Sequence, residues 1–80
     1  MAIYHFDYRN NEKLVPDKQG TEIADLETAR IDAIRILAEL ARGIDQPDHR
    51  VLSIEIREGH KPLLQVSLTL DIKTQSLGAR

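Results

Sequence analysis

The sequence contains no cysteine among its 80 residues. Disulfide bonds and thiolate metal sites are therefore excluded. Because a secreted domain of this size often depends on disulfides, the absence favours a reducing compartment, and we expect the protein in the cytoplasm. The first residues lack a basic segment followed by a long apolar core, so no signal peptide is predicted. No apolar run approaches the ~20 residues that cross a bilayer, so no membrane association is expected.

Aromatic residues, glycine and net charge are also scarce. The chain has two tyrosines, one phenylalanine and no tryptophan, and its four glycines are scattered rather than gathered into a phosphate-binding loop. The formal net charge of −2 disfavours nucleic-acid binding, which usually requires a basic excess on one face. No serine or threonine has a base and an orienting acid at recognisable spacing. The sequence predicts no catalytic residue, no cofactor and no metal ligand.

The composition that remains is that of a small globular protein. Apolar residues make up 41% of the chain and charged residues 30%, which is too apolar for a disordered segment. Eighty residues suffice for one domain but not for two. We expect this domain to occupy residues 1–70, followed by a flexible tail over residues 71–80.

Alternating apolar residues predict strands on both sides of one helix. In residues 2–9, Tyr4, Phe6 and Tyr8 fall on one face, which is typical of a half-buried strand. A short return strand is expected at residues 14–15, where Pro16 limits it. Two further strands are predicted over residues 51–57 and 62–70, joined by a hairpin connection.

Residues 26–42 form the clearest predicted element, an amphipathic helix. Its apolar stripe recurs at three- and four-residue steps and comprises Leu26, Ala29, Ala33, Leu37, Leu40 and Ile44. Asp25 is a good N-cap, and Gly43 a natural stop. The order strand, strand, helix, strand, strand predicts an α+β fold, in which the helix covers one face of a small antiparallel sheet.

An acidic group precedes this helix and contains Asp17, Glu22 and Asp25. Arg30 falls inside the apolar stripe of the helix, where a buried unpaired charge would be very costly. We therefore expect Arg30 to reach back to one of these carboxylates and to pin the loop to the helix. The alternative is a site in which the acidic group and Arg30 bind a small ligand.

The helix carries more apolar surface than one face requires. The additional residues, which extend the stripe around one flank, are Ile31, Ile34, Ala38 and Ala41. An exposed aliphatic patch commonly marks an interaction surface, so we expect a homodimer or another protein partner there. The alternative is that loops or the tail cover this flank.

Three histidines are the remaining candidates for metal ligands. His5, His49 and His60 fall on the polar face of a strand, in a loop and in a hairpin. None has a second ligand at helical or tight-turn spacing, so we interpret them as ordinary exposed residues.

Three segments resemble a known family. These are the aromatic first strand and the patterns P-D-x-x-G-x-E at residues 16–22 and D-L-E-x-A-R at residues 25–30. The chain resembles, over residues 3–70, a family of short bacterial proteins catalogued as a domain of unknown function. It departs from that family at the first turn, where Asn10-Asn11 stands in place of the usual Asp-Gly. The resemblance implies a small stand-alone bacterial protein and supplies no activity.

A second, fold-level resemblance is to antitoxins whose N-terminal domain places a partial ribonuclease-H-type sheet before a helix. The DNA-binding element that such antitoxins often append is missing here.

Three hypotheses follow for the function. The first is a non-enzymatic protein-interaction or self-associating module, the second an antitoxin-like regulator associated with nucleic acid, and the third a small-ligand binder. The acidic balance disfavours the second. A one-layer sheet with one helix leaves the third little room for a pocket, unless a dimer interface forms one.

Overall fold

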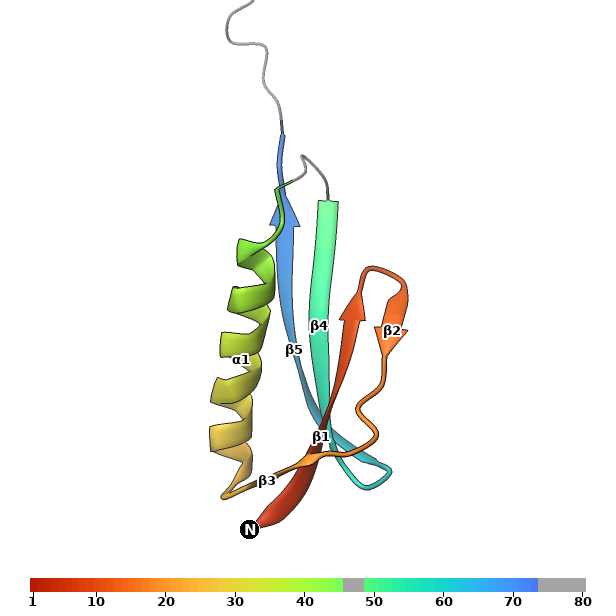
Figure 1. The fold of residues 1–80 in the computed structure, drawn as a ribbon, viewed down its shortest axis with the longest axis vertical. Coiled ribbons are helices and arrows are strands. Elements are labelled where there is room, and N and C mark those ends of the chain that lie inside the picture. Colours follow the sequence, from red (N-terminus) through yellow and green to blue (C-terminus); the bar gives the residue numbers. More distant parts are fainter. Residues whose placement is uncertain (46–48, 74–80) are drawn as a thin grey trace, which may run out of the picture.

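A computed structural model describes residues 1–45 and 49–73 of the chain, and residues 74–80 of the expected tail lie outside this part. The strands are β1 (Ala2–Asn10), β2 (Lys13–Val15), β3 (Thr21–Ile23), β4 (His49–Glu58) and β5 (Lys61–Asp71). The single helix of the described part, α1 (Leu26–Arg42), falls between β3 and β4 (Figure 1). No helix in this part combines the length and apolar character that crossing a membrane requires.

The strands form one antiparallel sheet in the order β2-β1-β4-β5, with β3 pairing to β1 as well. This arrangement confirms the predicted α+β class, with the helix on one face of the sheet. It adds a strand that the sequence did not predict, because β3 has only three residues. A segment that short shows no period of two that could be recognised.

β2 and β3 occupy the same edge of β1, one after the other. Tyr8 of β1 pairs with Val15 of β2, and Tyr4 pairs with Thr21 of β3. Pro16 ends β2, as expected of a residue that cannot donate to a strand ladder. Residues 16–20 therefore lie beside the middle of β1, and we call them the Asp17 loop.

The first turn shows how Asn10-Asn11 satisfies the geometry that Asp-Gly would provide. Asn11 adopts a left-handed conformation with φ 54°, which asparagine tolerates better than most residues. Its side-chain Oδ1 accepts a hydrogen bond from the Val51 backbone N–H at 2.8 Å. The Asn11 backbone N–H in turn donates to the Val51 carbonyl at 2.8 Å, so the turn is anchored to β4.

The helix begins and ends at the predicted residues. Asp25 is extended, and its Oδ1 accepts a hydrogen bond from the Thr28 backbone N–H at 2.8 Å, which makes it the N-cap. Gly43 follows the last turn, and its N–H donates to the Leu40 carbonyl at 3.2 Å. The buried helix residues are Ala29, Ala33 and Leu37, all members of the predicted stripe.

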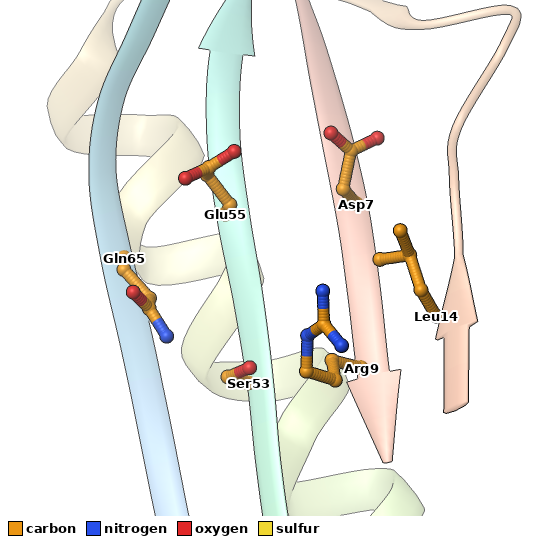
Figure 2. Close-up of a pocket in the computed structure, with 6 residues that line it drawn as sticks. All are labelled: Asp7, Arg9, Leu14, Ser53, Glu55 and Gln65. Atoms are coloured by element: carbon orange, nitrogen blue, oxygen red, sulfur yellow. The ribbon is translucent and has the colours of Figure 1, made fainter. Parts of the chain in front are cut away.

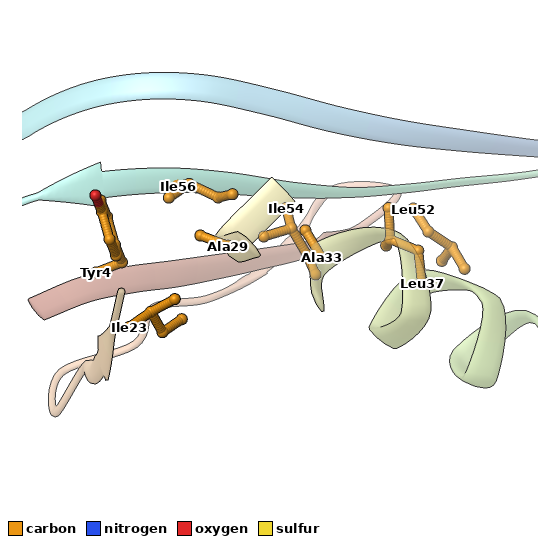
Figure 3. Packing of buried hydrophobic residues seen from close by; sticks show 8 residues of the cluster. All are labelled: Tyr4, Ile23, Ala29, Ala33, Leu37, Leu52, Ile54 and Ile56. Carbon is orange, nitrogen blue, oxygen red and sulfur yellow. The ribbon is translucent and has the colours of Figure 1, made fainter. Parts of the chain in front are cut away.

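The core lies between α1, β1, β3 and β4 (Figure 3). Its members are Tyr4, Ile23, Ala29, Ala33, Leu37, Leu52, Ile54 and Ile56. The alanines bring the helix close to β4, since they place only a methyl group between the two backbones. Because a helix is about 10 Å wide and strands lie about 4.8 Å apart, one helix cannot cover four strands. The helix packs over β4 and β5 and leaves Val15 of β2 47% exposed.

Candidate functional site

Asp17 ties the Asp17 loop to the middle of β1. Its Oδ2 accepts a hydrogen bond from the Phe6 backbone N–H at 3.0 Å, and its own backbone N–H donates to Asp7 Oδ1 at 2.9 Å. Asp17 Oδ1 accepts from the backbone N–H groups of Gln19 at 3.2 Å and Gly20 at 3.0 Å. The carboxylate thus closes the loop. It also accepts from β1 a hydrogen bond that a neighbouring strand would otherwise accept.

Arg57 of β4 connects the Asp17 loop on one side of β1 to β4 on the other side. Its Nε donates to Asp7 Oδ2 at 2.7 Å, and its Nη2 donates to the Asp17 carbonyl at 2.9 Å. Its Nη1 donates to the Gly59 carbonyl at 2.7 Å. The His5 Nδ1 lies 2.9 Å from the same Asp17 carbonyl. We call Asp7, Arg57 and Asp17 the edge cluster.

The edge cluster favours the ionised form of both carboxyl groups. Burial raises the pKa of Asp7, but the hydrogen bond from Arg57, the Asp17 N–H and the Arg57 charge together hold it below its ordinary value. Burial likewise raises the pKa of Asp17. The hydrogen bonds from the backbone N–H groups of Phe6, Gly20 and Gln19, together with the His5 charge, outweigh this effect of burial. The pKa of Asp17 is therefore also lowered. The Arg57 pKa is raised, chiefly by its hydrogen bond to Asp7.

This geometry assigns the pinning role to a different arginine from the one that the sequence predicted. Arg30 donates from Nε to Glu27 Oε1 at 3.2 Å, and its Nη2 also contacts Glu27 Oε2. Both side chains are exposed, with Arg30 at 42% and Glu27 at 65%. The Arg30 side chain therefore runs along the helix surface to a residue three positions earlier, where an ion pair is easily formed.

The predicted acidic group does not converge on Arg30. Asp25 caps the helix, and Glu22 of β3 pairs in register with Ile3 of β1. The hydrogen bonds from Thr28 hold the pKa of Asp25 below its ordinary value. Within residues 1–45 and 49–73, no hydrogen bond or ion pair joins any two of Asp17, Glu22, Asp25 and Arg30.

The sheet face opposite the helix has a shallow hollow of about 230 Å³ (Figure 2). Its lining side chains come from four strands and are Asp7, Arg9, Leu14, Ser53, Glu55 and Gln65. Asp7 is already engaged by Arg57, and Arg9 Nη1 lies 3.5 Å from the Glu12 carbonyl. A small-molecule site usually has at least about 300 Å³, so this hollow is small for one.

The described residues contain no cluster of three or more potential metal ligands. His5 contacts the Asp17 carbonyl, and His49 Nδ1 lies 3.8 Å from Asp71 Oδ1 at the far end of the sheet. His60 occupies the turn of the β4–β5 hairpin and is exposed. The three histidines are therefore dispersed over the molecule.

Two of the predicted interface residues, Ile34 and Ala38, lie on the side of α1 next to β5. Ile31 is 36% exposed and Ile34 is 45% exposed, and Ala38 is exposed between the helix and β5. Ala41 differs, because it is partly buried against the core. Beside Ile34 and Ala38 runs a groove of about 330 Å³, which is also lined by Leu37, Val66, Ser67 and Leu68. We call it the α1–β5 groove.

A second groove, of about 400 Å³, lies on the opposite flank of α1. Phe6, Ile23 and Ile36 form its apolar part. Its lining also includes the charged residues Asp17, Asp32 and Arg35, whereas no charged residue lines the α1–β5 groove. The sequence did not predict this second groove, because it depends on how far across the sheet the helix sits.

Comparison with known proteins identifies a family. The family model described as a domain of unknown function, DUF6894, matches residues 3–69. No curated protein and no solved structure matches the chain.

Proposed function

The chain belongs to the DUF6894 family, whose description names no reaction, and we propose that it works as a non-enzymatic protein-interaction module that associates with itself. We place it in the bacterial cytoplasm, in keeping with the family resemblance and the absence of cysteine. The alternatives of an antitoxin-like regulator and of a small-ligand binder stay predictions.

The observation that carries the proposal is the α1–β5 groove. Ile34 and Leu68, which are 45% and 37% exposed, border it, and Val66 forms part of its lining. An apolar groove without a charged lining residue gains free energy when a second apolar surface displaces its water. Ile31, which is 36% exposed, lies three residues before Ile34 on the helix.

The polar groups of the described residues support a structural rather than a catalytic role. Hydrogen bonds of the edge cluster hold the Asp17 loop and β4 to β1. A carboxylate that already accepts from an arginine and from backbone N–H groups is a weak base, as the lowered pKa values of Asp7 and Asp17 indicate.

Sedimentation velocity over a range of micromolar concentrations tests self-association. We expect the wild-type chain to sediment as a dimer at high concentration and to dissociate on dilution. Ile34→Glu should shift it to monomer, because the substitution introduces a charge into the apolar groove. Ile36→Glu is the matched control, since Ile36 is 42% exposed on the opposite flank of the same helix.

Two results would overturn the proposal. One is a wild-type chain that stays monomeric at every concentration. The other is an Ile34→Glu variant that associates as strongly as Ile36→Glu, which would move the contact away from the α1–β5 groove.

A further inference from the structure

The groove on the flank of α1 away from β5 combines apolar residues with charged ones. We call it the α1–β3 groove, because β3 and the helix supply most of its lining. Its volume of about 400 Å³ lies within the range of small-molecule sites. Of its apolar residues, Ile23 is buried, Phe6 is half-buried and Ile36 is exposed. This part of the groove suits the apolar body of a ligand.

The helix side of the groove carries two charges that are not paired with each other. In α1 an acidic residue precedes an arginine by three positions three times. The two pairs whose side chains contact each other are Glu27 with Arg30 and Glu39 with Arg42. The third pair, Asp32 and Arg35, lines the groove, and in the part of the chain that the structure describes neither side chain has a hydrogen bond or an ion pair. Both charges are therefore available to a ligand.

Asp17 supplies a second carboxylate, from the loop that precedes β3. Its oxygens accept three backbone N–H groups, those of Phe6, Gln19 and Gly20. Because a carboxylate has about four lone-pair positions, it can accept one further donor. Burial raises the pKa of Asp17, but these N–H donors outweigh it, so the carboxylate is ionised at neutral pH.

We propose that the α1–β3 groove binds a free α-amino acid that has an apolar side chain. The ammonium group of this ligand pairs with the carboxylates of Asp17 and Asp32, and its carboxylate pairs with the Arg35 guanidinium. Its side chain packs against the apolar residues of the groove. The inference goes beyond the proposed self-association, which uses the other flank of α1.

The combination of charges selects this class of ligand. An ammonium group has three donors, so it can serve two carboxylates at once. A guanidinium group binds a carboxylate through two parallel hydrogen bonds. A simple anion would meet two carboxylates beside the one arginine, and an uncharged apolar molecule would cover charged groups without pairing them. A zwitterion with an apolar side chain satisfies both signs of charge and the apolar residues.

Titration with L-phenylalanine, followed by the NMR shifts of the backbone amides, tests the site. Because the groove is open to solvent, we expect a dissociation constant of roughly 0.1–1 mM. The shifts should concentrate on residues 17–23 and 32–36 rather than on residues 66–68, which line the α1–β5 groove. Phenethylamine lacks the carboxylate and hydrocinnamate lacks the ammonium group, so each should bind at least about fivefold more weakly.

Two substitutions test the assigned charges. Arg35→Gln should weaken L-phenylalanine binding about fivefold and leave phenethylamine binding unchanged, because phenethylamine has no carboxylate. Asp32→Asn should weaken the binding of both amines and should not weaken that of hydrocinnamate. Glu39→Gln and Arg42→Gln are the controls, since this pair has the same spacing on α1 but does not line the groove. Neither control should change any of the three affinities.

The helix variants designed for sedimentation give a crossed comparison. Ile36→Glu should abolish L-phenylalanine binding, because Ile36 lines the α1–β3 groove. Ile34→Glu should keep the L-phenylalanine affinity within about twofold of wild type, because Ile34 lines the other groove. The two substitutions are therefore expected to have opposite effects on ligand binding and on self-association.

Three results would overturn the inference. The first is the absence of amide shifts at about 10 mM L-phenylalanine, well above the expected dissociation constant. The second is equal binding of the three ligands, which would mean that the charges play no part. The third is a set of shifts confined to the α1–β5 groove. None of these results depends on sedimentation, so the proposed self-association is tested separately.

Discussion

The two edges of the sheet end in different ways. On the β1 side, β2 and β3 pair with the two ends of the strand, and the Asp17 carboxylate accepts the Phe6 N–H between them. On the β5 side, no element within residues 1–45 and 49–73 pairs with the strand, and its central residues are uncharged. Within the described residues, a side-chain network closes one edge, and no strand pairs with the other.

The difference predicts which residues contribute most to the stability of the fold. Closing the β1 edge uses hydrogen bonds within the chain, so residues of the edge cluster should affect the free energy of unfolding. On the β5 side no described strand pairs with the outer edge, so residues of β5 that face outward should affect the free energy of unfolding less.

The largest expected effect comes from removing the Asp17 side chain. Asp17→Ala should lower the free energy of unfolding by about 3 kcal/mol, because three backbone N–H groups lose their acceptor and one lies within the sheet. Urea denaturation followed by circular dichroism measures this change. Lys18→Ala, in the same loop and exposed, is the control and should have little effect. Equal losses in the two variants would refute the assigned role of Asp17.

The two glycines with positive φ provide a matched comparison. Gly20 has φ 79°, and a Cβ placed on it would lie 2.6 Å from Ile3 Cγ2. Gly59 has φ 62° and no heavy atom within 4 Å of such a Cβ. Gly20→Ala should therefore cost about 1–2 kcal/mol more than Gly59→Ala, which has only the backbone penalty. The difference in urea midpoints checks this, and a larger loss for Gly59→Ala would contradict it.

Acid should lower the stability of the fold by protonating Asp7 and Asp17 at the β1 edge. The folded-state pKa values of Asp7 and Asp17 are lowered, so the stability they contribute is complete above the ordinary carboxyl pKa of about 4. This contribution is lost as the pH falls from there through the lowered folded-state values. Unfolding measured at neutral pH and near pH 3 should show a smaller acid loss for Asp17→Asn than for wild type. An unchanged acid loss would show that other carboxylates dominate.

The smallest expected effect lies on the open edge. Ser67→Lys, on the exposed polar face of β5, should change the free energy of unfolding by less than about 0.5 kcal/mol. The measurement belongs at a low concentration, so that the proposed self-association does not contribute to the result. A loss comparable to that of Asp17→Ala would mean that β5 contributes more to the isolated fold than its position at the edge indicates.

Much of the fold could be predicted from local patterns. Both predicted ends of the helix are confirmed. They could be predicted because the capping contacts of Asp25 and Gly43 lie within one turn of the helix ends. The faces of β1, β4 and β5 follow from alternation. β3 could not be recognised, because its three residues owe their strand conformation to pairing with Ala2–Tyr4.

The edge cluster was harder to predict for a related reason. Asp7 and Arg57 are fifty positions apart, and their contact depends on the register between β1 and β4. The sequence predicted the pinning role for Arg30 because this residue falls within an apolar stripe. A long side chain can leave such a stripe, however, and Arg30 pairs with Glu27 at the surface. The signal that could have identified Arg57 is the pairing of polar faces between strands, which requires the strand order.

The central position of β1 has a consequence for how the chain folds. The β4–β5 hairpin is local, whereas β1 must join β4 across the whole helix. Contacts between distant residues slow folding, because a long loop has to close before they form. During synthesis the first strand therefore emerges well before its main neighbour β4, and until then β2 and β3 are the described strands that can pair with it.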